Sequence, residues 1–301
     1  MLENKSTSGS ESCEVQKDNK GVGSRFSVHK PSLFDNDWVS SAATQAPQDS
    51  WARYVLTNLS GTGGIYLTTL RTWFARFPKA STETKNQLGS FMTSDHLGAV
   101  NEIFWWEWMK QFCWSAEPVK GKKHKRPDYH VSKPADFFCE VTTQNISDEV
   151  REQLSGGDGV DLNHERAGTI ERLFLKIQRE KLGQIQYGAF QKRPSVLVLF
   201  DYTFWSGLGV PFDELAEYLF GKQNGFASLP SELSAIVYVD RTVRGGRLGM
   251  SQLRSAVYHN PCAQFRLPKS VLPMICQYDS KLAVVSPAKS LIERDGWIWV
   301  E

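Results

Sequence analysis

The chain has 301 residues, and its 35 Lys and Arg against 33 Asp and Glu give a formal net charge of +2. This balance excludes a histone-like polycation and an acidic tail protein, although local basic patches can still bind nucleic acid. Five widely spaced cysteines without a Cys-X-X-Cys pair favour a cytoplasmic protein with reduced thiols over a disulfide scaffold or a zinc ribbon. The apolar runs are much shorter than the roughly 20 residues that span a bilayer, so we expect no membrane partner.

The first half of the chain predicts a leader followed by helices. Residues 1–37 are rich in Ser, Gly, Lys, Glu and Asn, which is typical of a disordered segment. Apolar residues at helical spacing indicate one or two helices within residues 51–78, and a stronger helix is predicted over residues 95–112. In that helix Glu102 lies close to the apolar side, whereas Glu107 lies further toward the polar side.

The remaining elements alternate between strands and helices. Short strands are predicted at residues 114–119, 128–132 and 136–143, and the last two form a hairpin around Lys133-Pro134. A helix at 165–187, a buried strand at 194–201, a helix at 213–220 and a buried strand at 234–240 follow, then a loop at 258–268 and short strands at 282–285 and 297–300. This order predicts an α/β fold with a mixed sheet flanked by helices, in one domain over residues 38–301.

The hairpin brings two carboxylates together. Pro127-Asp128 lies at the start of one strand, and Glu140 lies on the next strand, on the same face as Thr142. Two neighbouring carboxylates repel each other unless a cation lies between them. Mg²⁺ or Mn²⁺ is the natural partner, and such an ion can activate water and stabilise charge on a phosphodiester.

These residues, in this order, resemble the PD-(D/E)XK nuclease superfamily, which has the restriction-endonuclease-like fold. The resemblance extends over about residues 94–203. The residues after 203 are interpreted as a C-terminal extension of the sheet, and no mechanism is assigned to them. It implies that Asp128 and Glu140 bind the metal and that Glu102 on the preceding helix assists, directly or through water.

The sequence departs from the family at the motif lysine, since Thr142 stands in its place. Some branches of the superfamily carry this basic group on the following helix, and Lys181-X-X-Gln184 resembles that arrangement, with Lys176 as the second choice. Lys181 and Gln184 are three residues apart, so a helix places them on one face. We therefore expect the Lys181 ammonium within a few ångströms of the carboxylates of Asp128 and Glu140.

Basic residues cluster beside this expected site, and we assign them to the phosphate backbone of a nucleic acid, with DNA favoured over RNA. They are Lys120, Lys122, Lys123, Lys125 and Arg126, and a second set around Gly245-Gly246 includes Arg244 and Arg247. The alternative interpretation of such a run is an ordinary solvated surface.

Each acid also has a structural alternative: Asp128 as a turn residue, Glu140 as an exposed strand residue and Glu102 in a surface ion pair. Their joint occurrence favours a metal-dependent nuclease that hydrolyses phosphodiester bonds. The second hypothesis is a catalytically decayed nuclease fold that serves as a nucleic-acid-binding or interaction module, and Thr142 is the residue that motivates it. A Lys181 side chain pointing to bulk solvent would favour this second hypothesis.

Overall fold

Every residue described below lies in the compact unit Pro31–Glu301. The computed structural model describes residues 33–46, 51–91, 94–120, 126–146, 150, 152–153, 161–203, 208–221, 224–241, 250–251, 254–272, 276–280, 283–285, 293–294 and 297–298. The fold begins inside the segment assigned to the leader, because Leu33 and Phe34 are buried and helix α1 (Asn36–Gln45) follows them.

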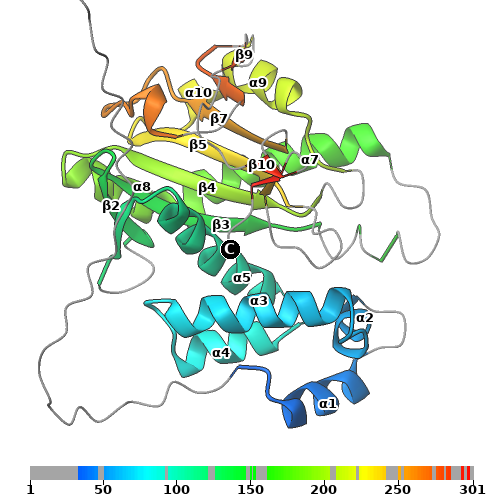
Figure 1. Cartoon of the computed structure of the whole chain (residues 1–301). Helices are drawn as coiled ribbons and strands as arrows, with labels where there is room; N and C mark the ends of the chain where they lie inside the picture. The colour runs from blue at the N-terminus through cyan, green and yellow to red at the C-terminus, as the bar shows by residue number, and fades with distance from the viewer. Residues whose placement is uncertain are drawn as a thin grey trace, which may run out of the picture. The chain divides into compact units, whose positions relative to one another are not determined.

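A mixed sheet of eight strands forms the centre of this unit (Figure 1). In spatial order the strands are β1 (Ser115–Pro118), β2 (Tyr129–Lys133), β3 (Phe137–Gln144), β4 (Ser195–Asp201), β5 (Leu233–Asp240), β7 (Ser255–His259), β8 (Cys276–Tyr278) and β9 (Ala283–Val285). Strands β3, β4 and β5 are parallel, whereas β1, β2 and β3 form antiparallel pairs. The predicted α/β class with a mixed sheet is therefore confirmed.

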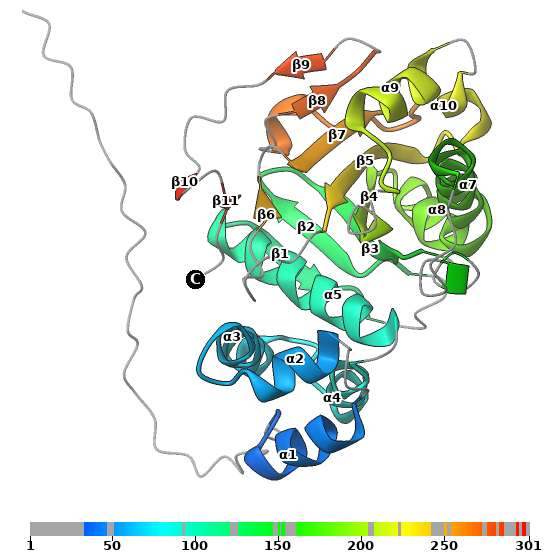
Figure 2. The ribbon, with the colours of Figure 1, turned by 90° about the vertical axis from the view of Figure 1, so that its right-hand side faces the viewer.

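Alternate residues of the central strands enter two separate cores, as strand geometry requires. Val196, Val198 and Phe200 of β4 pack toward helix α5 (Ser94–Gln111). Leu197 and Leu199 pack on the opposite side, in a core shared with helices α7 (Leu162–Leu175), α8 (Leu182–Phe190), α9 (Phe212–Phe220) and α10 (Gly225–Ser228). Figure 2 shows α5 on one side of the sheet and α7 and α8 on the other.

Helix α5 is itself covered by further helices on the side away from the sheet. Helices α2 (Trp51–Thr57), α3 (Thr62–Arg76) and α4 (Thr82–Gly89) pack there, together with α1, and α3 and α4 contact α5 (Figures 1 and 2). The sequence did not predict α1 or α4. Because α5 is buried from two directions, the expectation that Glu107 faces a polar side is wrong: its side chain is 3% exposed and pairs with Arg76 at 2.6 Å.

The predicted helix at residues 165–187 is interrupted. After α7, a π-helical segment η2 (Lys176–Glu180) precedes α8, and Lys181 stands at the junction with φ −105° and ψ 1°. An extra residue in a π-helical turn changes the direction of the side chains that follow it, and such turns are frequent at functional sites.

The last part of the chain departs from the expectation at strands β7 and β8, which were not predicted, and adds a small sheet. Strand β7 includes residues 258 and 259, the first two of the expected loop. A second sheet joins β10 (Glu293–Arg294), β11 (Trp297–Ile298) and β6 (Met250–Ser251), and a 3-10 turn η5 (Lys269–Val271) precedes β8. Within the described residues, every helix is too short or too polar to cross a membrane.

Candidate active site

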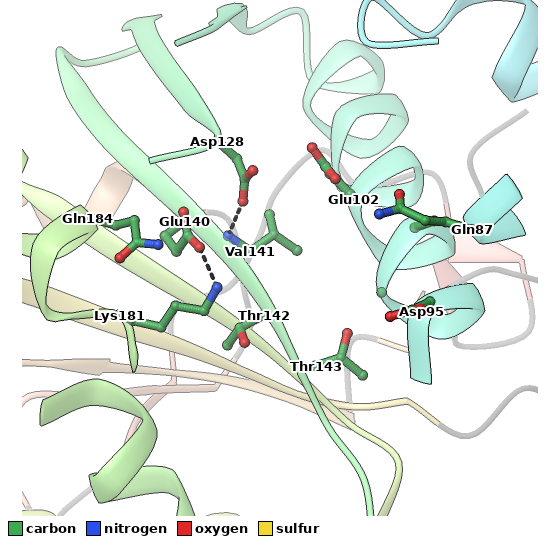
Figure 3. Close-up of a pocket in the computed structure, with 12 residues that line it drawn as sticks. Gln87, Asp95, Glu102, Asp128, Glu140, Val141, Thr142, Thr143, Lys181 and Gln184 are labelled. Carbon is green, nitrogen blue, oxygen red and sulfur yellow. Dashed lines mark hydrogen bonds and ion pairs between the residues drawn. The ribbon is translucent and has the colours of Figure 1, made fainter. Parts of the chain in front are cut away.

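A pocket of about 270 Å³ lies between α5, β3 and the start of α8, and all five residues predicted to be catalytic line it. They are Glu102, Asp128, Glu140, Lys181 and Gln184. Figure 3 shows Glu102 on α5 at one side of the pocket and Lys181 and Gln184 at the other, with Asp128 and Glu140 between them. The structure thus brings together side chains that are up to 82 positions apart in the sequence, from 102 to 184.

One face of α5 forms the first wall of the pocket. Asp95, Gly98, Ala99 and Glu102 line it at successive intervals of three, one and three residues, which places them on one side of a helix. A Cβ atom at Gly98 would meet no atom within 4 Å, so this wall is open at its middle. Asp95 was not among the residues predicted for the site, although its spacing of seven from Glu102 places it on the same side of the helix.

Asp128 joins the beginning of β2 to β3. Its Oδ2 accepts a hydrogen bond from the backbone N–H of Val141 at 2.9 Å, and its side chain is 9% exposed. The residue directly precedes β2, whose Tyr129 pairs with Cys139, so Asp128 lies beside Glu140 in the antiparallel ladder. The predicted proximity of these two carboxylates therefore follows from the register of the hairpin.

Glu140 meets Lys181 across the pocket. The Lys181 Nζ lies 2.6 Å from Glu140 Oε1, so the expected proximity holds for Glu140, one of the two carboxylates (Figure 3). Burial, reinforced by the negative charge of Asp128, raises the pKa of Glu140 to about 8 against the opposing effect of Lys181. Burial by itself would lower the pKa of Lys181, but the charge and hydrogen bond of Glu140, together with the charge of Asp128, outweigh it and raise the pKa, so the ammonium stays charged.

The two neighbouring positions complete this side of the pocket. Gln184 is buried and lines the pocket three residues after Lys181, and Thr142 lines it where the family motif has its lysine. The second-choice lysine is engaged elsewhere: Lys176 Nζ donates to the carbonyl of Thr143 at 3.2 Å and pairs with Glu180 at 3.4 Å. Between the two candidates, the geometry favours Lys181.

Sequence reasoning missed Lys79, which lies in the turn between α3 and α4. Its Nζ is 2.5 Å from Glu102 Oε1 and 3.0 Å from Asp128 Oδ1, and it stands 4.5 Å from the centre of the Tyr129 ring. Burial would lower the pKa of Lys79, but the charges of Asp128 and Glu102 together outweigh it and raise the pKa. Glu102 and Asp128 follow Lys79 at separations of 23 and 49 positions in the chain, and no spacing rule relates a turn to residues so distant.

Two of the predicted nucleic-acid contacts fall on described residues. Arg126 donates a hydrogen bond to the carbonyl of Lys120, and its guanidinium lies 5.7 Å from the ring of Tyr187 on α8. Lys122, Lys123, Lys125, Arg244 and Arg247 lie outside the described residues.

The residues of the pocket suit a hard divalent cation in their donor chemistry. Carboxyl groups from Glu102, Asp128 and Glu140 supply oxygen atoms, which Mg²⁺ and Mn²⁺ prefer, and their close grouping in a partly buried pocket disfavours the ionised form of all three at once. The raised pKa of Glu140 has the same origin, because burial and Asp128 both disfavour its charge. In the described part of the chain, however, no three Asp, Glu, His or Cys side chains converge as a ready-made ligand set.

Comparisons of the chain with protein-family models, with curated proteins and with solved structures find no match. A functional assignment therefore depends on the chemistry of the pocket.

Proposed function

We propose that the protein is a metal-dependent nuclease that hydrolyses phosphodiester bonds, built on a restriction-endonuclease-like core at about residues 94–203. The observation that carries this proposal is the pairing of Lys181 with Glu140 at 2.6 Å in a pocket that Asp128 and Glu102 also line. A helix acid, a hairpin with two acids and a lysine from the following helix thus meet at one place, each from the element where the resemblance requires it.

Asp128 and Glu140 would hold the Mg²⁺ or Mn²⁺ ion, with Glu102 beside them. When bound, such an ion supplies positive charge to phosphate oxygens and lowers the pKa of a water molecule. Lys181 keeps its ammonium at the pocket wall, where it can orient a water and offset the charge of the phosphate. Gln184, one turn further along, can accept or donate a hydrogen bond to the same water.

Contact with the phosphate backbone is assigned to Lys120 and Arg126, which directly precede the hairpin acids. Arg126 lies two residues before Asp128, and its guanidinium is exposed at the surface beside Tyr187. A cation in this position attracts a polyanion toward the carboxylates, and its contribution declines as salt is added. DNA remains the favoured partner, and RNA is the other substrate that the assay must include.

The experiment is an incubation of the full chain with supercoiled plasmid, single-stranded DNA and RNA, in Mg²⁺, in Mn²⁺ and in EDTA. We expect cleavage with metal and none with EDTA. Asp128→Asn should lower the rate by at least about a thousandfold, because several kcal/mol of charge stabilisation are lost with the carboxylate. The matched control is Asp136→Asn on the same hairpin, since Asp136 pairs with His130 and Arg193 and does not line the pocket. Cleavage by Asp128→Asn at the original rate would overturn the proposal.

The second candidate is a decayed nuclease fold that binds nucleic acid without cutting it. It is favoured by Thr142 at the motif position and by the ion pairs that Glu102, Asp128 and Glu140 already make with lysines. This candidate predicts binding that EDTA leaves unchanged and no cleavage with either metal. A gel-shift titration with and without EDTA, run beside the cleavage assay, separates the two.

A further inference from the structure

Lys79 is held in place by a set of contacts that is unusual for a lysine in a turn. Its ammonium meets Glu102 at 2.5 Å and Asp128 at 3.0 Å, and it stands over the ring of Tyr129 at 4.5 Å. Its own carbonyl accepts a hydrogen bond from the Thr84 hydroxyl at 3.0 Å, which fixes the turn against α4. The side chain is 25% exposed, so the ion pair is largely withdrawn from water.

The ammonium reaches the two carboxylates from outside the pocket. Glu102 and Asp128 both line the pocket, whereas Lys79 does not. Lys79 therefore acts on a molecule in the pocket through these two acids and without touching it, which makes it a positioning residue. Asp128 is also held by the backbone N–H of Val141, so it keeps its place when the lysine is removed.

The charges in this region make Lys79 a competitor of a bound cation. Lys181 pairs with Glu140, and Lys79 is the lysine that pairs with both Glu102 and Asp128. An ammonium within 3.0 Å of Asp128 Oδ1 opposes a second cation at the same carboxylate, because like charges repel strongly at this range in a partly buried site.

We infer that Lys79 is a built-in counter-ion, which keeps Glu102 and Asp128 together when the pocket holds no divalent ion and limits how tightly the pocket binds one. This inference rests on the metal site of the proposed function. It adds a role for the helical layer of α3 and α4, because the turn between these helices supplies the lysine.

The test is a Mn²⁺ titration of the full chain by calorimetry, without nucleic acid, on the wild type and three variants. Lys79→Met removes the charge, Lys79→Arg keeps it, and Lys85→Met makes the same change on α4 at a residue outside the pocket lining. We expect Lys79→Met to bind Mn²⁺ about tenfold more tightly or better, the size of effect that one unit charge has in a partly exposed site. Lys79→Arg and Lys85→Met should remain within about twofold of the wild type, since both keep a positive charge at position 79, beside Glu102 and Asp128.

An unchanged or weaker Mn²⁺ affinity in Lys79→Met overturns the inference, and so does an equal gain in Lys85→Met. If Lys79→Met does not fold, Lys79→Gln serves the same test, because its amide can still donate to Glu102 without a charge. Thermal unfolding provides a second measurement: Mn²⁺ should raise the midpoint of the uncharged variant by more than it raises that of the wild type.

Cleavage assays on the same proteins separate this inference from the proposed function. Tighter Mn²⁺ binding by Lys79→Met without cleavage by any of the proteins supports the role of Lys79 and overturns the nuclease. Cleavage by the wild type together with an unchanged affinity in Lys79→Met overturns the role of Lys79 alone. A wild type and a Lys79→Met protein that both fail to bind Mn²⁺ overturn both.

Discussion

Helix α5 has buried ionisable side chains on two sides, and the number of neighbouring acids differs between these two regions. Toward α3 and α4, Glu107 is paired with one arginine, Arg76, at 2.6 Å, and His96 is buried between the Tyr66 hydroxyl and the Leu88 carbonyl. Toward the sheet, Glu102 lies in a pocket with Asp128 and Glu140, and these three acids pair with Lys79 and Lys181. At the helical interface one buried carboxylate pairs with one arginine, whereas in the pocket three acids lie close together, and burial with the charge of Asp128 raises the pKa of Glu140.

This difference indicates which region is built for packing and which for chemistry. A stable interface can contain a buried charge that has one ion-pair partner. It can also contain a neutral buried histidine that makes two hydrogen bonds. Carboxylates gathered beyond the number of their cations destabilise one another, and such groups cluster at functional sites. The following changes test this contrast, from the largest expected effect to the smallest.

Removing the ammonium at the pocket wall should have the largest effect. Lys181→Met should lower the turnover rate of nucleic-acid cleavage by about a hundredfold or more, since a preorganised charge at the reacting phosphate is lost. Lys176→Met is the matched control, because this lysine of the preceding π-helical segment bonds to Thr143 and Glu180. The assignment of Lys181 is wrong if the two variants show the reverse order of rates.

His96 should make the protein sensitive to mild acid. Burial lowers its pKa from 6.5 to about 4, so the unfolded chain takes up a proton in this range and the folded chain does not. Stability is therefore complete above pH 6.5 and declines as the pH falls to 4, by up to about 3 kcal/mol for this shift. His96→Asn keeps a donor for the Leu88 carbonyl but does not titrate, so its free energy of unfolding should depend less steeply on pH over this range.

Urea unfolding at a series of pH values measures this slope. A variant with the same slope as the wild type would show that another group is responsible for the acid sensitivity. The absolute stability of the variant does not affect the comparison, because the prediction concerns the slope alone.

Arg76→Met should destabilise the fold without changing the chemistry of the pocket. It leaves the buried Glu107 carboxylate without this ion pair, which costs about 1–3 kcal/mol given that Arg76 is itself partly exposed. Burial already raises the pKa of Glu107 against the effect of Arg76, so the unpaired acid should bind a proton more readily. The double variant Arg76→Met, Glu107→Gln should recover part of the loss in urea unfolding, and a double variant as unstable as the single one would contradict this account.

The smallest effect is expected at the surface. Arg126→Ala should weaken nucleic-acid binding at low salt and reduce the slope of log affinity against log salt concentration by about one. Arg266→Ala is a matched control, because its guanidinium is also exposed and also donates to a backbone carbonyl. Equal slopes for Arg126→Ala and the wild type would remove Arg126 from the binding surface.

The local sequence predicted the elements that carry the site because each has a strong periodic or turn signal. The hairpin was predicted from two short strands with Lys133-Pro134 at the turn between them, and β2 and β3 lie within one residue of the predicted strands. The expected helix at residues 165–187 contains most of α7, all of η2 and most of α8, but periodicity does not reveal that a π-helical segment separates the two α-helices. Short or weakly amphipathic helices such as α1 and α4 give little periodic signal and were missed.

By itself, the sequence determined the α/β class, the hairpin that places Asp128 beside Glu140, and the helix that carries Lys181, since these depend on local pattern and strand register. Only the tertiary structure decided the partners of α5. The packing of α3 and α4 over this helix buries Glu107 against Arg76 and brings Lys79 to Glu102 and Asp128. Such contacts join residues far apart in the chain, and they form because burying apolar surface on both sides of α5 is favourable.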